Sequence, residues 1–325
     1  GQTASQALLS LFANSLANRN RGTVAASQQL TLAVDGQLLN SADGLIYSQN
    51  GGADVRAASF GNTKGTLQSQ GALQLVTGDV DNQSGRILAD AGNLDVTAGN
   101  LDNRGGVLSS LQGKLVADLR GVLNNGYDLN NNRQGGVTQA HALDLKVLGG
   151  IDNYGGRIAA QAGDALVSTA DFDNRNGGLY AQGLVKVTGG NFDNSGDNDG
   201  QIAGQRIVLG LSGALNNRLG IIESDSTLAI KAASLDNQTG QLRALGTSGA
   251  TRLQIGGPFD NRNGTLETAN SDLSLGVGSF LNAGGSLLHV GSGNFDISTA
   301  NVTGAGGSIV TRGGLTLNAD SWSNS

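Results

Sequence analysis

The chain of 325 residues has no cysteine and no methionine, one proline and few aromatic residues, which make up 4% of it. The absence of cysteine excludes disulfides and cysteine-based metal or thiol chemistry. The absence of an initiating methionine indicates a processed or excised piece. With so few bulky side chains, the chain lacks the groups that usually fill the rounded core of a globular domain.

Charged residues are also scarce, at 14%, and the formal net charge is −6. Lysine and arginine are scattered, so no basic stripe is present to neutralise phosphates or anionic lipids, and we expect no nucleic-acid partner. The longest apolar stretch, residues 7–16, contains three polar residues and is shorter than the ~20 residues of a membrane span. We therefore expect no membrane span.

Glycine (53 residues) and asparagine (32 residues) are abundant instead, and 38% of the residues are apolar. Disordered chains usually combine proline enrichment, high charge and few aliphatic residues, which is not the composition found here. The aliphatic residues are numerous enough to form a core, provided that they are regularly spaced.

A tripeptide of an apolar residue, usually Asp or Asn, and then Asn recurs about every 22 residues, at intervals of 20 to 28. Periods of 20–50 residues are typical of solenoids and other repeat architectures. The first, apolar positions of the tripeptide, which we call anchors, are Leu16, Leu39, Phe60, Val80, Leu101, Leu123, Ile151, Phe172, Phe192, Leu215, Leu235, Phe259, Phe280, Val302 and Trp322.

Two further positions repeat with the anchor. Eleven of the fourteen complete repeats carry Gly five residues after it and Leu or Ile seven residues after it. In the other three repeats, insertions displace the pattern to Gly22, Gly136 and Gly200. The second half of each repeat alternates apolar and polar residues, as in Leu73 and Leu75 around Gln74, which is typical of strands.

These patterns predict an all-β fold, a right-handed parallel β-helix (solenoid) of about 14 rungs with about 22 residues per rung. Rungs stacked at ~4.8 Å would pair each strand in parallel with its equivalents in the neighbouring rungs. We expect residues 1–15 to form a leading partial rung or cap-like segment and residues 16–325 to form a continuous shaft. A helix is expected nowhere, with residues 7–16 as the one open case.

Asparagine occupies the position two residues after the anchor in thirteen of fifteen cases, with Ser41 and Gly304 as the exceptions. Stacked amides can hydrogen-bond along a ladder at the strand spacing, and Asn tolerates left-handed corners. The repeated Gly would provide a second corner with positive φ. We therefore assign to a structural ladder, in preference to ligand binding, Asn82, Asn103, Asn125, Asn153, Asn174, Asn194, Asn217, Asn237, Asn261 and Asn282.

The repeat as a whole reads apolar-Asp-Asn, two variable residues, Gly, a variable residue, Ile or Leu, and then Leu-x-Leu. Over residues 16–322 it resembles the haemagglutinin repeat of filamentous haemagglutinin-type exoproteins. The resemblance implies two-partner secretion to the bacterial cell surface or medium, and service as a filament in adhesins or in the toxin-delivery proteins of contact-dependent growth inhibition. The Asn-Pro-Asn motifs of the family's secretion domain and a toxin-like terminus are absent, so the piece resembles the shaft.

Residues that could carry chemistry are few. His141 and His289 lie in different repeats without an acidic or nucleophilic partner, so we expect no enzyme, no catalytic residue and no cofactor. Asp193, Asp197 and Asp199 lie close together and offer oxygen ligands for a hard cation. This segment lacks the spaced ligands of an EF-hand, and a solvated insertion is the favoured interpretation.

The longest repeat has 28 residues and contains residues 126–135, which include Tyr127 and Arg133. Insertions in a solenoid bulge from one face and often carry binding residues, so these two are the candidate partner contacts. A passive loop is the alternative. A second bulge at residues 243–252 has no distinctive chemistry.

From the repeat and the family resemblance we expect a structural and adhesive shaft segment that presents an adhesin tip or an inhibition toxin. Its expected partners are neighbouring rungs of the same filament, the outer-membrane transporter during export and a target-cell receptor. Two alternatives stay open. One is a receptor-binding region of the same exoprotein, and the other is a carbohydrate-active β-helix enzyme, which would require a cluster of acidic and basic residues on one face.

Overall fold

The structure is a computed structural model that describes residues 1–128, 133–196 and 200–325. These residues form 39 strands and no helix. Contacts divide the chain into unit 1, Gly1–Ala170, and unit 2, Asp171–Ser325. Each unit is a right-handed parallel β-solenoid, which confirms the predicted fold class, with about 15 turns of about 21 residues in the chain. The described residues contain no helix long and apolar enough to cross a membrane.

The strands of unit 1 are β1 (Gln2–Ser5), β2 (Leu9–Ala13), β3 (Leu16–Ala17), β4 (Thr23–Ala26), β5 (Leu30–Val34), β6 (Gln37–Leu39), β7 (Leu45–Ser48), β8 (Ala53–Arg56), β9 (Ser59–Gly61), β10 (Thr66–Ser69), β11 (Leu73–Val76), β12 (Val80–Asp81), β13 (Arg86–Ala89), β14 (Leu94–Ala98), β15 (Leu101–Asp102), β16 (Val107–Leu119), β17 (Val122–Asn124), β18 (Val137–Val147), β19 (Gly150–Asp152), β20 (Arg157–Ala160) and β21 (Ala165–Thr169).

The strands of unit 2 are β22 (Phe172–Asp173), β23 (Gly178–Ala181), β24 (Leu184–Gly189), β25 (Phe192–Asp193), β26 (Gln201–Gly204), β27 (Arg206–Leu211), β28 (Ala214–Asn216), β29 (Ile221–Ser224), β30 (Leu228–Ala232), β31 (Ser234–Asp236), β32 (Gln241–Ala244), β33 (Ala250–Asp260), β34 (Thr265–Thr268), β35 (Asp272–Leu281), β36 (Ser286–His289), β37 (Asn294–Thr303), β38 (Ser308–Thr311) and β39 (Gly314–Ser323).

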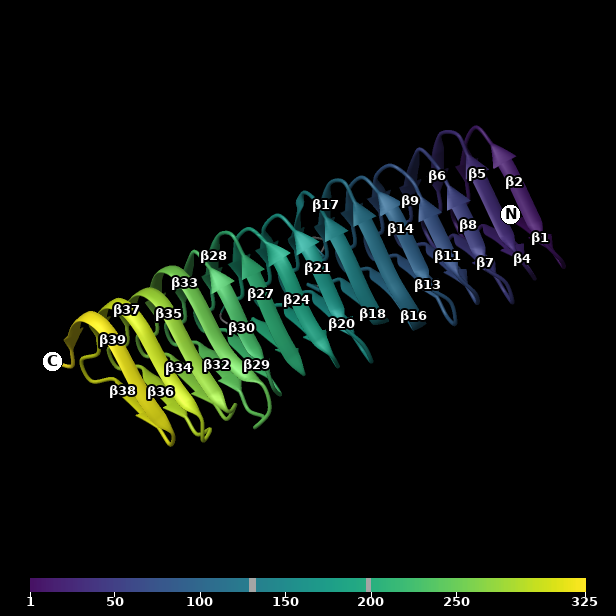
Figure 1. The fold of residues 1–325 in the computed structure, drawn as a ribbon. Helices are drawn as coiled ribbons and strands as arrows, with labels where there is room; N and C mark the ends of the chain where they lie inside the picture. Colours follow the sequence, from purple (N-terminus) through teal and green to yellow (C-terminus); the bar gives the residue numbers. More distant parts are fainter. Residues whose placement is uncertain (129–132, 197–199) are drawn as a thin grey trace. The chain divides into compact units, whose positions relative to one another are not determined.

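A regular turn contains three short strands, and each pairs in parallel with the equivalent strand of the next turn. In unit 1, for example, β10, β11 and β12 pair with β13, β14 and β15. Longer strands such as β16 join two sides of one turn without a break. Figure 1 shows the equivalent strands of successive turns lying side by side within each unit.

Alternation along the strands sends the repeated aliphatic residues inward, where equivalent residues stack into columns. In unit 2 the anchor column includes stacked phenylalanine rings, with centroids 4.5 Å apart for Phe172 and Phe192 and 5.2 Å apart for Phe259 and Phe280. Burial of a Leu or Ile side chain contributes roughly 1.5–3 kcal/mol. A single turn cannot provide this burial by itself, because the turns on either side cover its inward residues.

The one segment left open to helix is a strand. Leu9 to Ala13 form β2, which pairs in register with β5, and Leu9 lies opposite Leu30. Strand β1 pairs in the same way with β4. The alternating half-buried and exposed pattern of β2 shows that the period of two extends through this apolar stretch.

The asparagine side chains form a hydrogen-bonded ladder in each unit. Asn40 Nδ2, for example, donates to Asn62 Oδ1 at 2.7 Å, and the other steps within the two units measure 2.7 or 2.8 Å. All are buried. The ladder in unit 1 runs through Asn18, Asn40, Asn62, Asn82, Asn103, Asn125 and Asn153, and in unit 2 through Asn174, Asn194, Asn217, Asn237, Asn261 and Asn282.

The prediction of a left-handed corner at the ladder asparagines and at the repeated glycines was wrong. Neither set has positive φ; the positive φ belongs to the residue directly before the glycine, such as Lys64 (55°) or Thr239 (55°). The glycine is needed for another reason. A Cβ at Gly240 would lie inside van der Waals contact of the Asn217 backbone oxygen and 2.6 Å from Asn237 Oδ1.

The second anchor was also placed one residue too late. Leu38, and not Leu39, lies opposite Phe60, so the ladder position of that turn is Asn40 and Ser41 is no exception. The cause is an extra residue in the corner that follows. Two residues there have positive φ, Ala42 (52°) and Asp43 (64°), where later corners have one.

Candidate functional site

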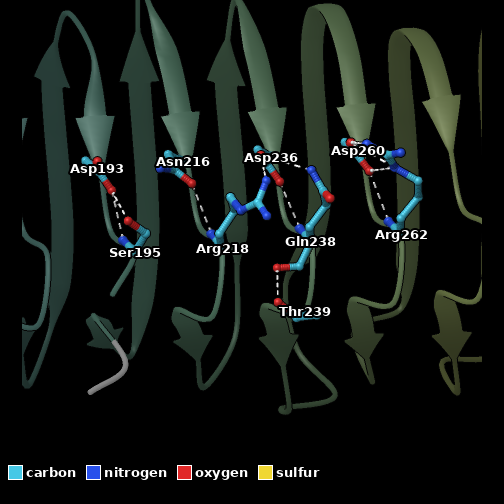
Figure 2. Close-up of polar contacts among 9 residues, drawn as sticks. All are labelled: Asp193, Ser195, Asn216, Arg218, Asp236, Gln238, Thr239, Asp260 and Arg262. Carbon is cyan, nitrogen blue, oxygen red and sulfur yellow. Dashed lines mark hydrogen bonds and ion pairs between the residues drawn. The ribbon is translucent and has the colours of Figure 1, made fainter. Parts of the chain in front are cut away.

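A column of carboxylates and amides lies at the outer side of many corners, one residue before the ladder asparagine. In each of these residues, a side-chain oxygen accepts a hydrogen bond from the backbone N–H two residues later, which is the geometry of an Asx turn. These bonds, 3.0–3.1 Å long in unit 2, close each corner locally (Figure 2). The pairs drawn there are Asp193 with Ser195, Asn216 with Arg218, Asp236 with Gln238, and Asp260 with Arg262.

Where such a pair consists of an aspartate and an arginine, the guanidinium also folds back onto the carboxylate, whereas Arg218, which follows Asn216, reaches Asp236 of the next turn. Arg262 Nη2 lies 2.6 Å from Asp260 Oδ2, and Arg104 pairs with Asp102 in the same way. The hydrogen bond that each guanidinium donates to its aspartate raises the pKa of both Arg104 and Arg262. These arginines are always charged, so this part of the column carries neutralised ion pairs rather than free carboxylates.

The Asx turn predicts different outcomes for two changes at Asp236. Its Oδ1 accepts from the Gln238 N–H at 3.0 Å, and the equivalent Asn216 makes the same bond with an amide oxygen. Asp236→Asn should therefore leave the free energy of unfolding within about 0.5 kcal/mol of wild type, whereas Asp236→Ala should lower it by about 0.5–1.5 kcal/mol. Urea unfolding measures both. Equal losses in the two variants would show that charge, and not the turn, matters here.

The inserted segment after Leu123 folds back on itself at its base. Gly136 N–H donates to the Gly126 carbonyl at 2.9 Å, and Asp128 N–H donates to the Gln134 carbonyl at 2.9 Å. Tyr127 and Gly135 form an antiparallel bridge between these bonds. The described ends of the insertion are therefore held as a short hairpin.

The hairpin is also anchored to neighbouring turns. The Tyr127 N–H donates to the Tyr154 carbonyl at 3.0 Å in the following turn. On the other side, Ser84 Oγ donates to Asp128 Oδ2 at 3.1 Å, two turns earlier in the chain. The Tyr127 ring lies against Gly155, where any Cβ would overlap it and where φ is +69°. These contacts fix the described ends of the insertion over the column of outer carboxylates and amides in unit 1.

The hairpin forms one wall of a pocket of about 530 Å³. The rings of Tyr127 and Tyr154 meet there edge to face, with centroids 5.2 Å apart, and Tyr154 is 38% exposed. Most phenylalanines of this aromatic-poor chain are buried instead. The lining residues are Arg104, Gly126, Tyr127, Asp128, Arg133, Asp152 and Tyr154.

A model of the family described as Haemagglutinin repeat matches residues 2–51, 199–251, 246–296 and 290–325, together more than half of the chain. The chain belongs to the haemagglutinin-repeat family. This confirms the resemblance inferred from the repeat. The match leaves out residues 52–198, a stretch that includes the Tyr127 hairpin.

A curated relative extends the comparison through most of this haemagglutinin-repeat chain. Deoxyribonuclease CdiA from Dickeya dadantii (strain 3937) is 29% identical over 286 residues, which cover 85% of this chain. The chain spans about 8% of the length of that relative. No solved structure matches the chain significantly.

Of the predicted site residues, Tyr127 and Arg133 lie together in the pocket. The proposed cation site is not brought together within the described residues, because Asp197 and Asp199 lie outside them. Asp193 Oδ1 accepts from the N–H and Oγ of Ser195, at 3.0 and 2.6 Å. Across residues 1–128, 133–196 and 200–325, no group of three or more His, Asp or Glu side chains could hold a metal.

Arg104 and Tyr154 also line the pocket, although they were not among the predicted site residues. Each lies two residues after an aspartate of the outer column, in the turn before and the turn after the insertion. Aligning the repeats on their anchors places these positions beside Tyr127 and would have found them. The assembled pocket combines aromatic rings, guanidinium groups and carboxylates in one hollow, which suits it to binding a ligand.

Proposed function

We propose that this chain is a structural and adhesive shaft segment of a bacterial cell-surface filament that is exported by two-partner secretion and presents an adhesin tip or an inhibition toxin. The observation that carries the proposal is the uniformity of the turns. Strands, buried amides and corner glycines repeat, and extra residues are diverted into loops. Membership of the haemagglutinin-repeat family and similarity to CdiA support it.

We infer further that the segment is not an enzyme and uses no cofactor. The outer carboxylates are engaged by backbone N–H groups or arginines, which leaves them poorly suited to proton transfer. The buried His289 contacts the Asn270 carbonyl and Thr311 Oγ1, each at 3.0 Å, and is 0% exposed. The name deoxyribonuclease belongs to a relative of which this chain spans 8%.

The proposed partners follow from the shaft role. Neighbouring rungs of the same filament would pack against one another, an outer-membrane transporter would pass the segment during export, and a target-cell receptor would be met at the surface. We propose that residues 16–325 form one continuous shaft, with residues 1–15 as its leading partial rung.

Removal of two whole turns in register tests the shaft proposal. Deleting Gly220–Asn263 joins Leu219 to Gly264, so that the corner keeps its Asn-x-x-Gly form and Asn282 follows Asn217 in the ladder. A shaft should keep its fold and shorten by about 10 Å, since each turn adds ~4.8 Å. In a CdiA-type exoprotein that contains this segment, surface display should persist. Circular dichroism, electron microscopy and surface labelling measure these outcomes.

The matched control is a deletion of Gly220–Ser274, which ends half a turn later and brings unlike strands together. It should abolish folding, because inward and outward residues no longer correspond. Loss of the fold or of surface display in the in-register variant would contradict modular shaft behaviour.

The anchored hairpin supports a second candidate function, a receptor-binding region of the same exoprotein. Shortening residues 126–136 to the length of a regular corner would test it. Target-cell binding should fall while the fold persists, and unchanged binding would exclude this function.

A further inference from the structure

We propose that the pocket beside the Tyr127 hairpin binds a neutral saccharide. The groups that line the pocket determine which ligand fits it, and this proposal does not depend on the shaft role. Sugars present hydroxyl groups that both donate and accept hydrogen bonds, beside apolar C–H faces. The pocket offers partners for both parts.

The aromatic part consists of Tyr127 and Tyr154. The two rings meet edge to face at 87°, and both tyrosines line the hollow, so a ligand there lies beside aromatic groups from two turns. The backbone N–H of Tyr127 donates to the Tyr154 carbonyl, and the Tyr127 ring packs on Gly155, so the ring is held in place. The aromatic wall is therefore preorganised, which reduces the entropy that binding would cost.

The polar part contains charges of both signs. The lining includes the guanidinium groups of Arg104 and Arg133 and the carboxylates of Asp128 and Asp152, and the Arg104 charge is also paired with Asp102. A phosphate or carboxylate ligand would meet two carboxylates, and a polycation would meet two guanidinium groups. A neutral ligand with hydroxyl groups meets no repulsion and finds donors and acceptors together.

Some of these groups have bonding capacity to spare. Arg133 is exposed, and neither its guanidinium nor the Tyr127 hydroxyl has a polar partner among the described residues. Asp152 accepts the Tyr154 N–H through Oδ1 at 2.9 Å, and no hydrogen bond to its Oδ2 is found among the described residues. The pocket volume, about 530 Å³, lies within the range of small-molecule sites.

The test uses the full chain and saturation-transfer NMR with maltose, lactose and cellobiose as neutral probes. A chondroitin disaccharide and a glucosamine disaccharide serve as acidic and basic probes. We expect transfer to at least one neutral probe and weaker transfer to the charged ones. Tyr127→Ala should weaken binding about tenfold or more, and Arg133→Ala by a smaller factor.

Tyr47→Ala is the matched control, because Tyr47 is a partly exposed tyrosine on β7 of the same unit and lines no part of this pocket. It should bind as wild type. If Tyr127→Ala fails to fold by circular dichroism, Arg133→Ala decides, since Arg133 is exposed and its loss leaves the packing intact. No transfer to any neutral probe, preference for a charged probe, or wild-type binding by the decisive variant would each overturn the proposal.

The two proposals can fail separately. The in-register deletion that tests the shaft removes residues of unit 2 only, whereas the pocket lies wholly in unit 1. A folded, displayed chain that binds no neutral sugar would reject the saccharide site and retain the shaft. A chain that binds the sugar but loses its fold on turn removal would do the reverse.

Discussion

Gly285→Ala is expected to lower the free energy of unfolding by about 3–5 kcal/mol, at the upper end for a single substitution. The new Cβ would overlap the backbone oxygen of Asn261 and lie 2.5 Å from Asn282 Oδ1. Both atoms belong to the hydrogen-bonded corner, where Gly285 N–H donates to the Asn282 carbonyl at 2.9 Å. Relief of the overlap requires two turns to move apart, which breaks the ladder between them. Urea unfolding followed by circular dichroism measures the loss.

Gly276→Ala is the matched control in the same unit. Gly276 is exposed on β35, its φ is not positive, and the nearest atom to an added Cβ is 4.0 Å away. Alanine there should be neutral or should stabilise the chain by up to about 1 kcal/mol, because glycine in a strand loses more backbone entropy on folding. A comparable loss in both variants would contradict the steric explanation and would indicate a general need for glycine.

The two glycine substitutions show that the repeat indicates where glycine is required but not why it is required. Spacing alone identified the corner glycines, because a packing requirement repeated in every turn leaves a regular trace. Spacing could not show the cause, since positive φ and close backbone approach both select glycine. The structure separates them: Thr239 has the positive φ, and Gly240 beside it has the close approach.

The register error at Leu39 has a similar origin. In β6, Leu38 is buried and Leu39 is half-buried, and both positions carry leucine. Leu39 has the usual spacing to Gly44, whereas Leu38 has the usual spacing to Asn40, and the parallel pairing with Phe60 decides for Leu38. The length of the next corner, one residue longer than most, cancels the error, so the following anchor was again correct.

The pocket was partly predictable for a different reason. The length of the repeat located Tyr127 and Arg133, because an insertion has to leave the column. Arg104 and Tyr154 come from other turns, and their role depends on how the hairpin folds back across the corners. Repeats aligned on the anchor would give the neighbours of the insertion, whereas the direction in which the hairpin folds depends on contacts such as Ser84 with Asp128.

Asn237→Ala should lower the free energy of unfolding by about 2–4 kcal/mol, because each buried polar group left without a partner costs about 1–3 kcal/mol. Asn237 Nδ2 donates to Asn261 Oδ1 at 2.7 Å and to the Thr265 carbonyl at 3.2 Å, and its oxygen accepts from Asn217 at 2.7 Å. Alanine removes all three bonds. Asn261 Oδ1 and the Thr265 carbonyl lose this donor, and Asn217 Nδ2 keeps only its longer bonds to the Gly220 and Gln241 carbonyls, at 3.3 and 3.2 Å. Urea unfolding at pH 7 measures the loss, and the exposed Asn294→Ala, expected within about 0.5 kcal/mol of wild type, is the control.

Asn237→Asp tests whether the side chain at this position must donate hydrogen bonds along the ladder as well as accept one. A carboxyl there can still accept from Asn217, but when ionised it has no proton for Asn261 Oδ1 or the Thr265 carbonyl. Burial and these facing oxygens should raise the pKa of the new carboxyl in the folded chain above its ordinary value of about 3.9. The unfolded chain then ionises first, so the stability of this variant should fall as the pH rises from about 4 to 7, relative to wild type. A difference that does not change with pH would show that the amide at this position donates no hydrogen bond that stabilises the turns.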